Sequence, residues 1–234
     1  AGETANKITF TSNESTKAAG DWGTIRFNNT SDVGSILNYV IIEYGGGAGT
    51  GAMITYRTGA LGVDVTNSEL RFSALHGIDL RASSPTITNT IISDNAGYGV
   101  FSDLALNFRV DSSTVNRNTQ GGIRIPINST PEIEASRIDS NGTGIYIDNG
   151  AIPVIKFNTI EENTRGILVI EAAGQSPTIT DNTFRNNEIF AIDNQGGGSV
   201  VAEFNFWGDK TGPINFQNPA GKGDDVSNNI DFTP

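Results

Sequence analysis

The sequence predicts an all-β protein, a single-stranded right-handed parallel β-helix whose short strands stack into a solenoid. The composition favours strands over helices, because only 36% of the 234 residues are hydrophobic and Gly occurs 28 times. Such a mixture is typical of short strands joined by tight turns, and no apolar run longer than about two turns has helical spacing. A block of apolar residues also recurs at intervals of 22–24 residues, which is the signature of a repeat architecture.

Four rows of equivalent positions define this repeat. The second row lies five positions after the first and the third lies eight positions after it, so insertions fall outside the block. The first row is Val65, Ile87, Val110, Ile133, Ile155, Ile179 and Val201. The second row is Leu70, Ile92, Val115, Ile138, Ile160, Phe184 and Phe206. The third row is Ser73, Asn95, Asn118, Asn141, Asn163, Asn187 and Asp209. The fourth row is Ile78, Val100, Ile123, Ile145, Ile167 and Ile192.

The apolar rows are expected to point into the solenoid and the Asn row to form a buried ladder. Equivalent side chains on successive coils would stack about 4.8 Å apart, and each coil would bury its apolar face only against its neighbours. Asn suits a turn because it tolerates left-handed backbone and its amide can bond the next Asn. The Asn row is therefore interpreted as a structural ladder and not as an active site.

One domain of about nine coils, roughly 40 Å long at the strand spacing, is expected over residues 1–234. Residues 1–64 form irregular N-terminal coils, 65–204 the regular coils and 205–234 a C-terminal capping segment. In that cap, Trp207 would cover the last apolar layer while Asp209 extends the Asn row. A Gly-rich stretch at 45–51 lacks the Lys-Ser/Thr of a phosphate loop and is interpreted as a flexible connection.

The charge excludes several classes of partner. The formal net charge is −11 and cysteine is absent, so disulfides and Cys-ligated zinc are excluded. A nucleic-acid partner would require a basic stripe, and an acidic surface is not attracted to anionic membranes. No apolar run approaches the roughly 20 residues of a membrane span. We expect neither nucleic-acid binding nor membrane insertion.

Segments at both ends carry a family resemblance. Residues 8–12 and 20–25, ITFTS and GDWGTI, resemble the first coils of secreted surface β-helices, and NFWGDKTGP at 205–213, with residues 218–226 and 230–234, resembles their closing segment. The chain thus resembles bacterial and archaeal extracellular right-handed parallel β-helix repeat proteins of the surface-protein type, within the pectate-lyase-like superfold. The resemblance implies an extracellular or cell-surface location and leaves the function open.

An outward row beside the fourth apolar row is the candidate binding face. Arg124 would lie between Phe101 and Tyr146 and could present its guanidinium to a uronate carboxylate flanked by two aromatic faces. Loops beside this row offer Asp103, Asp148 and Glu171 as further ligand-binding groups. The alternative is an exposed stacking ladder that only covers the sheet. The complete row is Asp79, Phe101, Arg124, Tyr146, Leu168 and Asp193.

No complete catalytic constellation is visible in the sequence. Pectin hydrolases of the pectate-lyase-like superfold combine several Asp residues with a Gly-His-Gly. The only His of this chain, His76, lacks the preceding Gly and a paired Asp. We therefore expect no catalytic residues, with Arg124, Asp79 and His76 as the candidates if the protein is an enzyme.

A second outward row contains the candidate metal site. Asp111 and Glu134 are adjacent on this row and would repel each other unless Lys156, Arg109 or a cation intervenes. Ca²⁺ is the possible cofactor, because oxygen ligands from neighbouring coils suit it.

Three functions remain after these exclusions. The preferred one is a non-catalytic extracellular or cell-surface domain, a rigid scaffold that contacts polysaccharide or a surface partner. The first alternative is a polysaccharide lyase or epimerase that acts on acidic glycans through the face of Asp79, Phe101, Arg124 and Tyr146. The second is a structural spacer of a larger surface protein.

Overall fold

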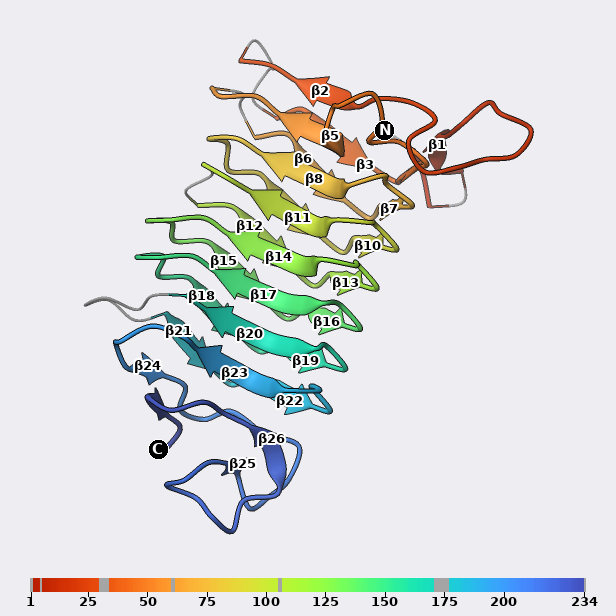
Figure 1. The fold of residues 1–234 in the computed structure, drawn as a ribbon. Coiled ribbons are helices and arrows are strands. Elements are labelled where there is room, and N and C mark those ends of the chain that lie inside the picture. The colour runs from red at the N-terminus through yellow and green to blue at the C-terminus, as the bar shows by residue number, and fades with distance from the viewer. Residues whose placement is uncertain are drawn as a thin grey trace.

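The computed structural model is an elongated parallel solenoid in which three sheets run along a single core (Figure 1). The structure describes residues 2–4, 6–29, 34–59, 62–104, 107–170 and 177–233. Every coil contributes one short strand to each sheet, and within each of the three sheets the paired strands are parallel. The described residues contain strands and no helix, and hence no helix capable of spanning a membrane.

The first sheet has eight strands of three or four residues. They are β1 (Ile8–Phe10), β4 (Val40–Glu43), β7 (Glu69–Arg71), β10 (Ile91–Ser93), β13 (Thr114–Asn116), β16 (Arg137–Asp139), β19 (Thr159–Glu161) and β22 (Thr183–Arg185).

The second sheet also has eight strands, and all but its first have five residues. They are β2 (Ile25–Phe27), β5 (Ala52–Tyr56), β8 (His76–Leu80), β11 (Tyr98–Ser102), β14 (Gly121–Ile125), β17 (Thr143–Ile147), β20 (Arg165–Val169) and β23 (Phe190–Asn194).

The third sheet has nine strands of two or three residues. They are β3 (Ile36–Asn38), β6 (Asp64–Thr66), β9 (Thr86–Thr88), β12 (Arg109–Asp111), β15 (Glu132–Glu134), β18 (Val154–Lys156), β21 (Thr178–Thr180), β24 (Val200–Val201) and β27 (Ile230–Asp231). Two further strands, β25 (Pro213–Ile214) and β26 (Gly223–Asp225), pair separately near the C-terminus. The expected nine coils are slightly more than the complete three-strand coils that these sheets form.

The interior confirms the apolar rows of the regular coils. From Val65 to Ile179, from Leu70 to Phe184 and from Ile78 to Ile192, every member of the three rows is at most 1% exposed. The strand register stacks equivalent members directly on one another, for example Val115 on Ile138. Burying one such side chain contributes about 1.5–3 kcal/mol, and no coil realises that contribution without its neighbours.

The Asn ladder forms as predicted, with one difference in backbone conformation. Asn141 illustrates the pattern: its Oδ1 accepts hydrogen bonds from the backbone N and Nδ2 of Asn118, both at 3.0 Å. Its own Nδ2 donates to the carbonyl of Val115 at 2.9 Å. The left-handed residue of each turn is the one before the ladder residue, so the Asn is needed for its hydrogen bonds and not for its φ. These preceding residues are Phe72, Asp94, Arg117, Ser140, Glu162 and Asn186.

A second polar ladder, which the sequence rows did not include, runs along the other turn of the solenoid. In it a side-chain oxygen accepts a hydrogen bond from the buried backbone N–H of the coil before, as Ser113 does from Thr90 at 3.1 Å. This hydrogen bond satisfies a backbone N–H that lies in the turn, where it has no partner in either sheet and no access to water. The members of the ladder lie three positions after the first apolar row, except that Asn205 lies four positions after Val201, and are Ser68, Thr90, Ser113, Ser136, Asn158, Asn182 and Asn205.

At the C-terminal end the sequence rows are wrong by one position. Val201 and Phe206 are 44% and 43% exposed, whereas Ala202 and Trp207 are buried in their place. The indole of Trp207 stacks on Phe184, with ring centroids 5.0 Å apart and planes inclined by 10°. Trp207 thus covers the last apolar layer, and this contact sets the register of the final coil.

The Asn ladder also ends on a different residue from the one predicted. Asp224 on β26 accepts from the backbone N and Nδ2 of Asn187 at 2.9 and 2.8 Å. Asp209 is partly exposed and bonds Thr211 in its own loop. The carboxylate that ends the ladder therefore comes from a segment outside the repeat. Counting repeat positions along the sequence cannot identify it.

Candidate functional site

The candidate binding face is the outer surface of the second sheet. The strand register places Asp79 beside Phe101, Phe101 beside Arg124 and Arg124 beside Tyr146, on β8, β11, β14 and β17. Residues that alternate with these point into the core, so the outward residues are held on a rigid sheet. The structure therefore brings together the four residues of the predicted face; Leu168 and Asp193 continue the row on β20 and β23.

Arg124 lies between two aromatic rings. Its Cζ atom is 5.0 Å from the ring centroid of Phe101 and 5.7 Å from that of Tyr146. Such cation–π contacts are worth about 0.5–1 kcal/mol each at exposed sites. Arg124 Nη2 also lies 2.9 Å from Asp148 Oδ2, and both side chains are 25% exposed. The guanidinium is thus fixed in orientation, while its remaining N–H groups can donate to a ligand.

His76 extends this aromatic array on β8. Its ring stacks on Phe101 with centroids 4.3 Å apart and planes inclined by 5°, and it contacts Tyr98 in a tilted arrangement at 5.9 Å. Nδ1 accepts a hydrogen bond from the backbone N–H of Tyr98 at 2.9 Å. Burial, assisted by the charge of Arg124, lowers the pKa of His76 to about 4. The imidazole is therefore neutral at pH 7, with its acceptor nitrogen already used.

Asp79 is buried although it points outward from the sheet. Its Oδ2 accepts from Nε of Arg81 at 3.0 Å, while Oδ1 has no hydrogen-bond partner among the described residues. Burial raises the pKa of the Asp79 carboxyl, and the negative charge of exposed Asp103 adds to that effect. Glu171, the third acidic group expected beside this face, lies outside the residues that the structure describes.

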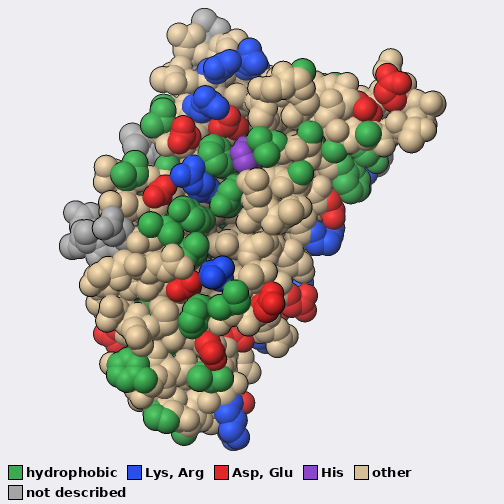
Figure 2. Space-filling view, in the orientation of Figure 1, with side chains coloured by type: hydrophobic (Ala, Val, Ile, Leu, Met, Phe, Trp, Pro, Cys, Tyr) green, Lys and Arg blue, Asp and Glu red, His purple; other side chains and the backbone are tan. Residues whose placement is uncertain are grey.

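A basic pocket lies at the N-terminal end of the same face, and the sequence rows did not include it. Arg26, Arg57 and Arg81 line a cavity of about 280 Å³ together with Thr50 and Thr55. Basic side chains gather at this end of the molecule above the aromatic centre of the face (Figure 2). The sequence contains a pattern that could have indicated this pocket, because Arg57 and Arg81 each follow an inward Ile by three positions.

The Gly-rich stretch forms one wall of this basic pocket. Residues 48–50 contribute to its lining, and the stretch is attached to the preceding coil by hydrogen bonds from Gly46 N to Gly23 O and from Gly47 N to Trp22 O. A Cβ on Gly47 would lie only 2.0 Å from the carbonyl oxygen of Gly20. The stretch is thus a packed loop, and its interpretation as a flexible connection is wrong.

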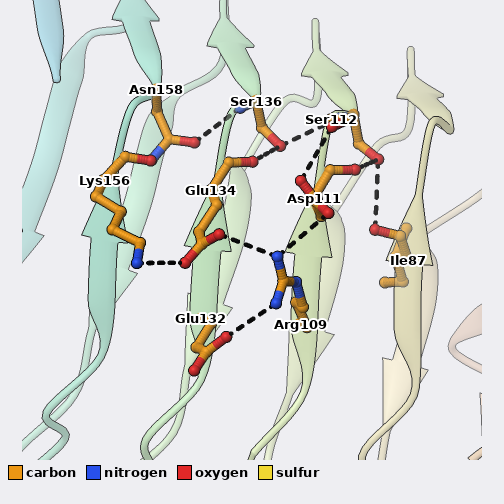
Figure 3. Close-up of polar contacts among 10 residues, drawn as sticks. Ile87, Arg109, Asp111, Ser112, Glu132, Glu134, Ser136, Lys156 and Asn158 are labelled. Atoms are coloured by element: carbon orange, nitrogen blue, oxygen red, sulfur yellow. Dashed lines mark hydrogen bonds and ion pairs between the residues drawn. The ribbon is translucent and has the colours of Figure 1, made fainter. Parts of the chain in front are cut away.

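The candidate metal residues lie on the outer face of the third sheet, where basic side chains separate them (Figure 3). Arg109 Nη2 contacts Asp111 Oδ2 at 3.3 Å and Glu134 Oε2 at 3.0 Å, and Nη1 contacts Glu132 at 3.2 Å. Lys156 Nζ lies 2.9 Å from Glu134 Oε1, and this contact raises the pKa of Lys156. Within the described ranges no group of three His, Cys, Asp or Glu side chains could hold a metal ion. A Ca²⁺ here would have to displace Arg109.

Comparison with known proteins identifies the family. The family model described as a right handed beta helix region matches residues 50–206, which is more than half of the chain. The chain belongs to the right-handed β-helix family. The crystal structure of the pectate lyase Pel9A is similar in fold, with a TM-score of 0.48 and 15% sequence identity over 96% of this chain and 68% of that chain. No curated protein matches the sequence.

In this right-handed β-helix the second sheet thus offers two neighbouring groups of side chains to a ligand. The centre offers the partly exposed rings of Phe101 and Tyr146 and one oriented guanidinium, which suit a sugar ring and an acidic substituent. The N-terminal end offers a concave basic pocket. The third sheet offers charges that already neutralise one another.

Proposed function

We propose that this protein is a non-catalytic scaffold that binds an acidic polysaccharide along the outer face of its second sheet. The observation that carries the proposal is the array of His76, Phe101, Arg124 and Tyr146, in which aromatic faces and a fixed guanidinium follow one another along the axis of the rod. A polysaccharide repeats its rings and charges along one direction, as this face does.

The state of the candidate catalytic side chains supports a binding function over catalysis. The Nδ1 acceptor of His76 is used by a backbone donor, and Arg124 is paired with Asp148. A general base needs a free acceptor within reach of the proton that it removes. Neither side chain offers one in this arrangement.

The proposed ligand also sets the proposed location. Long acidic polysaccharides are components of cell surfaces and of the material between cells, so a protein that binds them acts outside the cell. The resemblance to surface β-helices at residues 8–25 and 205–234 supports the same location.

Affinity gel electrophoresis tests the proposal. The wild-type protein should migrate more slowly in native gels that contain alginate, pectate or a sulfated galactan than in a gel without polysaccharide. A Phe101→Ala/Tyr146→Ala variant should lose this retardation. The matched control is Phe157→Ala/Phe216→Ala, which removes two exposed aromatic rings from elsewhere on the molecule and should leave the retardation unchanged. Equal retardation of both variants would refute the binding face.

A second candidate function, a polysaccharide lyase or epimerase, is favoured by one observation on Asp79. A buried carboxyl with a raised pKa and an unpartnered oxygen is a possible proton donor or acceptor. Incubation with alginate and pectate, followed by ultraviolet absorbance of unsaturated uronates and by NMR of the sugar configuration, distinguishes this function. Product formation that Asp79→Asn and Arg124→Ala abolish would replace the binding proposal. Neither product nor retardation across a glycan panel would leave the spacer function.

A further inference from the structure

We propose that the pocket of Arg26, Arg57 and Arg81 binds a tetrahedral oxyanion, the sulfate or phosphate ester group of the polysaccharide. This inference rests on the proposed function, since it names the chemical class of the glycan that the second sheet would bind. The pocket is distinct from the aromatic array and lies on the coils of β2, β5 and β8, the last of which also carries His76 of that array.

The three arginines come from three consecutive coils. Arg26 is the outward residue of β2, while Arg57 and Arg81 follow the last residues of β5 and β8. Consecutive strands are about 4.8 Å apart, so one pocket receives guanidinium groups spaced along the rod axis. Each guanidinium offers a rigid fork of N–H donors that suits oxyanions.

The arginines of this pocket outnumber its carboxylates, because Asp79 contacts Arg81 and its charge also acts on Arg57, while Arg26 has no such neighbour among the described residues. Among the described residues, seven of the ten arginines form ion pairs, and those that do not are Arg26, Arg57 and Arg185. Two of these three therefore lie in a single pocket of a protein whose net charge is −11. Arg81 is the only member of the pocket with a carboxylate partner, Asp79. Arginines that repel each other at one place are stabilised by an anion that binds between them.

The number of guanidinium groups and the size of the cavity favour a tetrahedral group over a carboxylate. A carboxylate presents two coplanar oxygens, which one guanidinium fork satisfies. A sulfate or phosphate ester presents three terminal oxygens in different directions, which three guanidinium groups can share. Thr50 and Thr55 also line the cavity, but their hydroxyls are bonded to Gly47 O and to Thr24 Oγ1, so the guanidinium groups are the donors for the anion. The cavity volume of about 280 Å³ lies near the lower limit of about 300 Å³ for small-ligand sites.

The pocket and the aromatic array are placed so that one polymer can reach both. The strand register runs from Arg26 through Thr55 and Asp79 to Phe101 and then Arg124. These four strand steps span roughly 19 Å. A chain of sugars lying along the rod would therefore place a ring on the aromatics while an ester group enters the basic pocket.

The test compares three derivatives of one neutral polymer at equal charge density and fixed ionic strength: dextran sulfate, dextran phosphate and carboxymethyl dextran. Isothermal titration calorimetry should give at least about tenfold tighter binding, about 1.4 kcal/mol, for one or both ester derivatives than for carboxymethyl dextran. The Arg26→Gln/Arg57→Gln variant should lose that preference. Arg185→Gln, which removes an unpaired exposed arginine from β22, should retain it.

Each outcome separates the two proposals. Esters preferred in the wild type and not in the double variant support the inference, and the better derivative identifies the ester. Equal affinity for all three derivatives, or a preference that survives in Arg26→Gln/Arg57→Gln, overturns it. An Arg26→Lys/Arg57→Lys variant keeps the charge and should lose part of the preference. Phe101→Ala/Tyr146→Ala should weaken all three derivatives alike; if it weakens none while the preference remains, only the aromatic binding face fails.

Discussion

The outer faces of the second and third sheets use similar side chains in opposite ways. On the third sheet Arg109 contacts Asp111, Glu132 and Glu134, and Lys156 contacts Glu134. On the second sheet Arg26 and Arg57 have no carboxylate partner among the described residues, and the guanidinium of Arg124 lies between aromatic rings. Both faces cover the same apolar core. The two faces therefore differ in whether their basic side chains form ion pairs with carboxylates, and not in how many charges they carry.

The largest expected effect concerns the Asn ladder, which lies at the turn between the first and second sheets. Asn141→Ala removes an amide that bonds Asn118, Val115 and Asn163 and leaves buried donors and acceptors unsatisfied, at about 1–3 kcal/mol for each group. We expect a loss of about 2–4 kcal/mol in the free energy of unfolding, measured by urea denaturation.

Asn149→Ala is the matched control for the ladder, because no side-chain hydrogen bond of Asn149 is found among the described residues. It should change stability by less than about 0.5 kcal/mol. If Asn141→Ala were equally mild, the Asn ladder would not contribute to the stability of the solenoid.

The pH dependence of the free energy of unfolding tests the environment of His76 on the second sheet. His76 is the only histidine of the chain, and its pKa is lowered to about 4 in the folded protein from about 6.5 when unfolded. The unfolded state therefore binds the proton more readily between these values, so stability falls as the pH decreases through this window. Compared with His76→Gln, the wild type should lose about 3 kcal/mol more between pH 7 and pH 4.

NMR titration of the single imidazole checks the same prediction directly. A pKa near 4 is expected from the ring's burial against Phe101 and its acceptor contact with Tyr98. A value near 6.5 would mean that the ring is solvated and does not belong to the aromatic array.

Matched arginine variants should separate the two faces. Arg109→Gln leaves three carboxylates without their common partner and should cost about 1 kcal/mol of stability at low salt, less at high salt. Its retardation in polysaccharide gels should equal that of the wild type. Arg124→Gln should instead weaken the retardation. Loss of binding in Arg109→Gln would show that the third sheet also contacts the ligand.

The smallest expected effect concerns Ca²⁺. Because Arg109 lies between Asp111 and Glu134, and Lys156 contacts Glu134 from the next coil, adding millimolar Ca²⁺ or EDTA should shift the Tm of the wild type by less than about 1 °C. In an Arg109→Gln/Lys156→Gln variant, Ca²⁺ should raise the Tm. A clear Ca²⁺ stabilisation of the wild type would favour the predicted metal site.

The fold could be predicted from the sequence wherever one coil repeats the chemistry of the next. Ile87, Val110 and Ile133 reveal their row because β-branched residues recur at nearly constant spacing and stack directly. Periodicity alone could not decide whether Val201 or its neighbours point inward, since three apolar residues follow one another at 200–202. The stacking of Trp207 on Phe184 decides it.

Rows whose members have the same function but differ in residue type could not be predicted from the sequence. The second ladder uses Ser, Thr and Asn, which have in common only an oxygen that accepts from a backbone N–H. The basic pocket escaped because the spacing from Ile25 to Ile54 is 29 residues, whereas Ile54 to Ile78 is 24. The aromatic array could be predicted because its coils are regular, while the burial of Asp79 against Arg81 depends on how that turn packs.

The most direct test of the difference between the two faces is amide chemical-shift mapping during titration with a sulfated oligosaccharide. If only the second sheet binds the ligand, the perturbed amides should lie on β8, β11, β14 and β17 and beside the basic pocket, with none on β12, β15 and β18. Perturbations centred on β12, β15 and β18, or spread equally over both sheets, would contradict this prediction.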